Sequence, residues 1–196
     1  MKQFLKQSFY TLAGLPLIYH LGNPWRGRAC VLCYHRVLPD DEIERDKSPN
    51  SCLIMPASRF SEQMKFLAEN YEVVSINELV EHLEGNSNRF VVAVTFDDGY
   101  KDTLHTIAPI LHEYRIPFTV FVISDFVKHK VKDYLNEKEL FELSQLPKVT
   151  IGSHGSTHTP LTELSEANLI EELVSSKKYL EDVTSHNINI ISYPHG

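Results

Sequence analysis

Short apolar runs alternate along the chain with segments whose apolar residues recur at helical spacing. Apolar runs of this length predict buried β-strands, and apolar residues every three to four positions predict amphipathic helices. The predicted strands lie at residues 30–35, 71–76, 90–96, 118–124, 149–153 and 187–196. The predicted helices lie at residues 58–70, 77–86, 102–114, 136–147 and 165–185, and a polar surface loop is expected at 38–52.

Strands that alternate with helices predict parallel β/α units with the helices packed outside the sheet. The alternation fits a (β/α) barrel and also an open doubly wound sheet. No glycine-rich phosphate loop follows the first strand, which disfavours a dinucleotide-binding sheet. The pattern therefore favours the barrel.

The ends and faces of the helices give further expectations. Ser58 and Asn77 stand where a side chain can cap a helix, and Gly85 stands where the second helix would end. The expected apolar faces are Phe60, Met64 and Leu67 in the first helix and Leu169, Leu173 and Leu180 in the last.

Composition describes an ordinary globular protein. The 196 residues are 42% hydrophobic and 23% charged, which suits one domain with a sizeable core. The formal net charge of −7 gives no basic face, so nucleic acid is not expected as a partner. We expect the domain to span residues 29–196.

Residues 1–28 are expected to form a separate lead-in segment. Two lysines precede an apolar stretch that Gly14, Pro16 and His20 interrupt, so it falls short of the ~20 apolar residues that cross a bilayer. No clear cleavage site marks a signal peptide. The prediction is an amphipathic helix, docked on the domain or resting on a membrane surface, with a cytoplasmic or membrane-peripheral location. The oligomeric state is left open.

Three cysteines do not make an even disulfide framework. Cys30 and Cys33 have C-x-x-C spacing, but they lie in a predicted strand, where residues three apart point to opposite faces. No second pair follows to complete a zinc site. They are therefore expected to be small buried residues.

Polar clusters follow the predicted strands. They are residues 34–36, 97–100, 153–158 and 193–196. In a β/α barrel the carboxyl ends of the strands gather on one face, where active sites are built. Four clusters from distant parts of the chain would therefore meet on one rim.

The clusters contain the groups of a metal-dependent hydrolase. His154 and His158 are four residues apart, which lets two imidazoles reach one cation, and one aspartate would complete three protein ligands. The neighbouring Asp97 and Asp98 can divide the work, one as ligand and one as general base. The alternative is that one of them caps the following helix.

The stretches TFDDGY at 95–100, SHGSTH at 153–158 and YHRV at 34–37 resemble the polysaccharide deacetylase family, the NodB-homology domain of carbohydrate esterase family 4. The resemblance implies a deformed (β/α) barrel and hydrolysis of N-acetyl, or O-acetyl, groups on a carbohydrate or polysaccharide. It implies Asp97 as general base. Asp98, His154 and His158 would be the ligands of a divalent metal, usually zinc.

The third family motif departs from its usual form, R-x-P-Y/F-G. Ser192 stands in place of the arginine that pairs with the catalytic aspartate, so Asp97 is expected to be tuned by another group, Arg36 or Lys101. His195 takes the place of the aromatic residue and is a candidate catalytic group.

The later family segments, including the one with the general-acid histidine, have no counterpart before Gly196. This predicts a barrel that lacks its C-terminal strands and a domain that is incomplete at its C-terminus. The alternative function is a catalytically impaired remnant of the same fold that binds carbohydrate or metal.

Overall fold

The computed structural model describes residues 29–43, 51–85 and 88–196. Within them a parallel sheet contains five strands, and a separate parallel pair contains two. The strands of the larger sheet are β1 (Ala29–Tyr34), β4 (Glu72–Val73), β5 (Val91–Phe96), β6 (Phe118–Val122) and β7 (Val149–Ser153). The separate pair is β2 (Arg36–Leu38) and β3 (Ile54–Pro56). The predicted lead-in segment 1–28 lies outside the described residues.

The register of the sheet brings the strand ends to one edge. The sheet runs in the order β1-β5-β6-β7, and β4 pairs with Val91 and Val92 at the start of β5. Along β1 the pairing with β5 runs to Tyr34 opposite Phe96, so both strands end together. Every pairing in the sheet is parallel. Because the strands are parallel, the loops after β1, β5 and β7 leave the sheet at the same edge.

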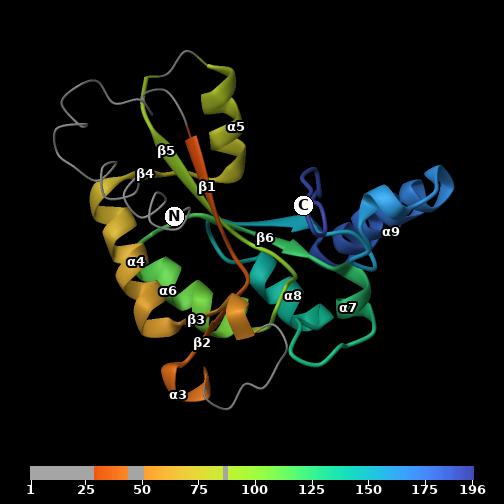
Figure 1. Ribbon diagram of the computed structural model, residues 1–196, viewed down its shortest axis with the longest axis horizontal. Coiled ribbons are helices and arrows are strands. Elements are labelled where there is room, and N and C mark those ends of the chain that lie inside the picture. Colours follow the sequence, from red (N-terminus) through yellow and green to blue (C-terminus); the bar gives the residue numbers. More distant parts are fainter. Residues whose placement is uncertain (1–28, 44–50, 86–87) are drawn as a thin grey trace, which may run out of the picture.

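Helices alternate with the strands along the chain and pack around the sheet (Figure 1). They are α3 (Asp40–Ile43), α4 (Ala57–Asn70), α5 (Ile76–Glu84), α6 (Ala108–Glu113), α7 (Ser124–Lys128), α8 (Glu137–Ser144) and α9 (Glu166–Thr184). Short 3₁₀ turns are η1 (Ser51–Leu53) and η3 (Leu161–Glu163), and a π-helical turn, η2 (Thr103–Ile107), leads into α6.

The main core lies between the sheet and the α4–α6 pair. All six residues of β5 and all five of β6 are buried. Helix α4 contributes Phe60, Met64 and Leu67, the face that the sequence predicts. Phe60 packs edge-on against Phe96, with the ring centroids 5.8 Å apart. This packing fixes the end of β5, from which the candidate site begins.

The structure corrects several sequence-based predictions. The segment expected to be a loop contains α3 and η1, with β2 and β3 at its two ends. The expected last strand contributes only a parallel bridge between Ile191 and Ser153 of β7. On α9 the predicted Leu180 is buried, but it shares that face with Glu172, Ser176 and Thr184, whereas the predicted Leu169 and Leu173 are partly exposed. Tertiary contacts of polar side chains therefore decide which face of α9 is buried.

The prediction that the cysteines are buried is wrong for Cys33. Cys30 is half-buried, Cys33 is exposed, and both thiols are free. Strand β1 is an edge strand of the sheet. Val31, on the same face of β1 as Cys33, is also exposed. None of the described helices is both long enough and apolar enough to cross a lipid bilayer.

Helix α5 is capped by Ser75, not by Asn77. The Glu78 backbone N–H donates to Ser75 Oγ at 3.3 Å, and the Ser75 N–H donates to Glu78 Oε2 at 2.8 Å. This reciprocal pair is a capping box. Helix α4 begins after Pro56 with no side-chain cap, so the prediction for Ser58 is also wrong.

Ser75→Ala is expected to lower the free energy of unfolding by about 1 kcal/mol, because it removes one of the two reciprocal bonds. Asn77→Ala is the matched control, since Asn77 is exposed and its side chain does not cap the helix. Urea unfolding of both variants measures the difference. Equal stability of the two variants would contradict the assignment of the cap.

Candidate metal centre and catalytic site

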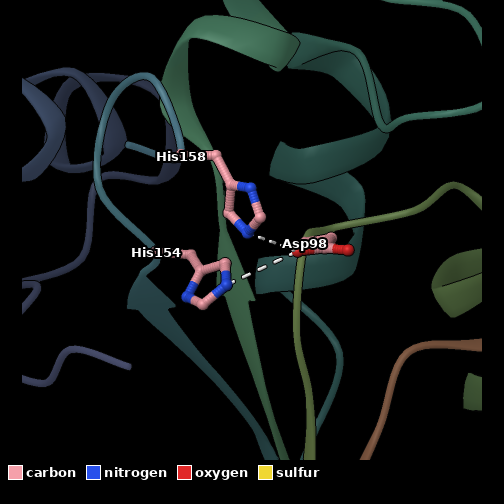
Figure 2. A group of neighbouring side chains, drawn as sticks. All are labelled: Asp98, His154 and His158. Carbon is pink, nitrogen blue, oxygen red and sulfur yellow. Dashed lines mark ion pairs between the residues drawn. The ribbon is translucent and has the colours of Figure 1, made fainter. Parts of the chain in front are cut away.

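Two strand ends deliver three potential metal ligands to one place. Asp98 is the second residue after β5, His154 directly follows β7, and His158 comes after the three residues that follow His154. Figure 2 shows both imidazoles pointing toward the Asp98 carboxylate. One potential ligand atom from each of the three residues lies within 4.8 Å of the other two. The three groups that the sequence proposes as ligands are therefore brought together.

The spacing of these atoms suits a small divalent cation. Asp98 Oδ1 lies 3.4 Å from His154 Nε2 and 3.4 Å from His158 Nε2. Two ligand atoms bonded to zinc at roughly 2.0–2.1 Å with tetrahedral angles are about 3.3 Å apart. Two imidazoles and one carboxylate are also a donor set that zinc accepts in catalytic sites. The residues therefore fit a divalent metal.

The ring of His154 is held in the orientation that metal binding needs. Its Nδ1 lies 2.9 Å from the carbonyl oxygen of Ser192. A carbonyl can only accept, so Nδ1 carries a proton and Nε2 is the nitrogen that faces Asp98. Nε2 donates to Asp98 when it is protonated and offers its lone pair to a cation when the ring is neutral. Such a bond on the second nitrogen is typical of histidines that bind metals. His154 is also buried, with 3% of its surface exposed.

The three groups influence one another's ionisation. Burial alone would raise the pKa of Asp98, but the hydrogen bond from His154 and the charge of His158 outweigh burial, so the pKa is lowered. Burial opposes protonation of His154, yet its bond to Asp98 and the charge of Asp97 raise its pKa. Burial lowers the pKa of His158. Asp98 therefore stays ionised between the two imidazoles, and its negative charge favours the binding of a cation there.

Asp97 lies beside the metal ligands and is held by neutral donors. Ser192 Oγ donates to Asp97 Oδ2 at 3.3 Å, and Cys33 Sγ lies 3.4 Å from the same oxygen. Although Cys33 as a whole residue is exposed, its thiol faces Asp97, and the partial loss of solvent there together with the charge of Asp97 raises the pKa of Cys33 to about 11. The thiol therefore stays protonated and donates. The sequence did not indicate this contact, because it joins residues 64 positions apart on two neighbouring strands.

The two cations considered for tuning Asp97 have other partners. Lys101 Nζ lies 3.2 Å from Asp133 Oδ1. Arg36 Nε lies 3.3 Å from Asp102 Oδ1, and both side chains are buried. The contacts found on Asp97 come instead from Ser192 and Cys33.

One carboxylate oxygen of Asp97 has no hydrogen-bond partner among the described residues. Asp97 Oδ1 is buried and accepts no hydrogen bond from any residue that the structure describes. An unsatisfied buried carboxylate oxygen costs free energy, and such groups are found where a ligand or water supplies the partner. The free oxygen therefore marks Asp97 as a group that can receive a proton from a bound molecule.

A buried group supports the turn after Asp98. Asp102 Oδ2 accepts the Val37 N–H at 2.8 Å, and the Arg36 guanidinium lies 4.7 Å from the centre of the Tyr100 ring. Tyr100 in turn stacks on Tyr134. Arg36 therefore has a structural place at the rim, next to the site.

His195 also reaches the site. Its ring centroid lies 4.6 Å from that of His158, and the residue is exposed. All five residues proposed from the sequence thus lie in one cluster.

Three residues of the site have a strained backbone. Asp98, His158 and His195 have φ angles of 73°, 67° and 64°, in the left-handed region that costs non-glycine residues free energy. Strain of this kind is common where side chains must be aimed at a ligand.

Comparison with known proteins adds independent observations. The family model for polysaccharide deacetylases matches residues 84–196. A Bacillus subtilis protein described as a polysaccharide deacetylase, YxkH, is 30% identical over 169 residues, which are 85% of this chain and 56% of that protein. The poly-beta-1,6-N-acetyl-D-glucosamine N-deacetylase of Staphylococcus aureus is 28% identical over 155 residues, 71% of this chain and 52% of the enzyme. The chain thus spans about half the length of these relatives.

Among solved structures, the Streptococcus pyogenes deacetylase PplD in complex with acetate is similar to this chain with a TM-score of 0.74 and 27% identity. The match covers 86% of this chain and 74% of PplD. The likeness confirms the predicted fold class, an α/β fold of the deformed NodB barrel type, of which the described residues form a parallel sheet that is part of a barrel.

Proposed function

The chain belongs to the polysaccharide deacetylase family, and we propose that it hydrolyses N-acetyl groups of a carbohydrate polymer with the help of a divalent cation, zinc by preference. One observation carries this proposal: potential ligand atoms of Asp98, His154 and His158 lie within 4.8 Å of one another. Asp97 lies beside them and shares the partner Ser192 with His154. A structural role alone would not require a buried carboxylate oxygen without a hydrogen-bond partner, as Asp97 Oδ1 is among the described residues, in the residue that precedes the proposed ligand Asp98.

The residues of the chain divide the reaction between them. A divalent cation held by Asp98, His154 and His158 would supply a Lewis acid next to the acetyl carbonyl. Asp97 accepts a proton from the attacking water through its free oxygen, while Ser192 and Cys33 hold the other oxygen in place. Water adds to the acetyl carbon, the C–N bond breaks, and the products are acetate and a free amine on the sugar.

The departing amine must gain a proton as the C–N bond breaks. His195 is the exposed titratable side chain next to His158, and we assign it to this step. Its position at the solvent edge of the site lets it exchange protons with water between turnovers.

The substrate proposed is a polymer that contains N-acetylglucosamine. The Staphylococcus aureus relative is named for its action on poly-beta-1,6-N-acetyl-D-glucosamine. The site also faces solvent, because the His158 side chain is 26% exposed and His195 is exposed. A sugar unit in a long polymer can therefore reach the ligands from solvent.

Acetate release from N-acetylglucosamine oligomers tests the proposal. The 196-residue chain loaded with zinc is expected to release acetate, and removing the metal with a chelator is expected to stop the release. Adding zinc back should restore it. A folded chain that binds zinc and releases no acetate would reject the catalytic proposal in favour of the alternative, a remnant that binds carbohydrate or metal.

A further inference from the structure

The turn that joins the two candidate metal histidines is held by a carboxylate from a distant helix. Glu172 lies on α9 and is buried, with 6% of its surface exposed. Burying a carboxylate is costly unless hydrogen bonds satisfy it. The partners of Glu172 are therefore the reason for its position.

Those partners are the backbone of the turn itself. The Ser156 N–H donates to Glu172 Oε1 at 2.8 Å, and the Thr157 N–H donates to the same oxygen at 2.7 Å. Thr157 Oγ1 lies 3.2 Å from each carboxylate oxygen. Residues 155–157 are the whole connection between His154 and His158, so Glu172 binds two of its three backbone N–H groups.

Neighbouring groups complete the support. Ser176, one helical turn after Glu172, donates from Oγ to the Gly155 carbonyl at 3.0 Å. Its Oγ also lies 2.7 Å from Ser153 Oγ, which accepts the Gly155 N–H at 3.1 Å. On the opposite side, the Asp125 N–H of α7 donates to the Ser156 carbonyl at 3.0 Å. The turn is therefore held between α7 and α9.

Gly155 shows how closely the carboxylate approaches the turn. A Cβ at this position would lie 2.8 Å from Glu172 Oε1, and the residue has a φ of 77°. Both features favour glycine. The turn is shaped around the carboxylate, and its shape sets the separation of the two imidazoles.

We propose that Glu172 is a positioning residue that fixes the turn 155–157 and so holds His154 and His158 at the spacing that binds a divalent cation. This inference rests on the metal site of the proposed function. Replacing a residue that orients metal ligands typically lowers the metal affinity 10- to 100-fold. A residue that only stabilised the fold would change the melting temperature and leave the affinity of the folded chain unaltered.

The test measures zinc affinity by competition with a chromophoric chelator, together with thermal unfolding of the metal-free chain. Glu172→Ala is expected to weaken zinc binding by about 10- to 100-fold. Glu172→Asp keeps the charge but shortens the side chain by one methylene, so it loses its reach and is expected to weaken binding about 10-fold. Glu172→Gln keeps a carbonyl oxygen for the two N–H groups and is expected to bind zinc more tightly than the Ala and Asp variants.

The matched control is Glu171→Ala, because Glu171 is the neighbouring acidic residue on α9 and is exposed. Its zinc affinity should equal that of the parent chain. Parent-like affinity in the folded Glu172→Asp variant would overturn the proposal, and this variant decides the outcome if Glu172→Ala does not fold. If the parent chain binds zinc but releases no acetate, the proposed deacetylase activity is rejected and the role of Glu172 is still tested by zinc affinity. If the parent chain binds no zinc, both the proposed activity and the positioning role of Glu172 are rejected.

Discussion

Asp97→Asn is expected to lower the rate of acetate release by about 10²- to 10⁴-fold, the usual contribution of general base catalysis. Asparagine has the same size and can still accept the hydrogen bond from Ser192, but its amide cannot take a proton from water. Zinc binding should be unchanged, because the ligand atoms come from Asp98, His154 and His158. Initial rates and zinc titrations on the same preparation measure both effects.

Asp182→Asn is the control for Asp97→Asn, since Asp182 is an exposed aspartate on α9 and should keep the parent rate. Two results would contradict the role of Asp97. Loss of zinc from the Asp97 variant would make Asp97 a ligand, and an undiminished rate would assign the base to another group.

His154→Ala is expected to remove zinc binding at concentrations that saturate the parent chain. The variant loses one of three ligand atoms together with the ring that the Ser192 carbonyl orients. The loss of affinity should exceed the 10- to 100-fold that replacing a supporting residue costs. Zinc content after dialysis, measured with acetate release, should fall in parallel.

His186→Ala is the matched control for His154→Ala, because His186 is exposed just after α9 and should leave both zinc content and rate unchanged. Since His154 is buried, thermal unfolding of the metal-free variant separates lost packing from lost coordination. Stoichiometric zinc in a folded His154→Ala chain would mean that the cation is bound elsewhere.

The regular elements were predictable because their signals are local. The apolar runs at β5 and β6 become strands buried on both faces. The spacing of Phe60, Met64 and Leu67 becomes the buried face of α4. These patterns follow from the period of the strand and of the helix, which the order of residues alone specifies.

The errors arise where long-range contacts override local preference. On α9 the leucine spacing indicated one face, but hydrogen bonds to the turn 155–157 bury Glu172 and Ser176 instead. The segment 187–196 has the alternation of a strand, yet it forms only the bridge at Ile191 before turning to the site. A capping residue also depends on where the helix starts, and a shift of two residues moved the cap of α5 from Asn77 to Ser75.

The sequence by itself determined which groups can bind a cation and that they follow the ends of parallel strands, because ligand chemistry and strand periodicity are properties of neighbouring residues. Only the tertiary structure decided what surrounds those groups. Cys33 and Ser192 meet Asp97 from 64 and 95 positions away along the chain, and Glu172 reaches back 16 positions to the turn between the histidines. Such contacts depend on how the strands and α9 pack together, which no local pattern specifies.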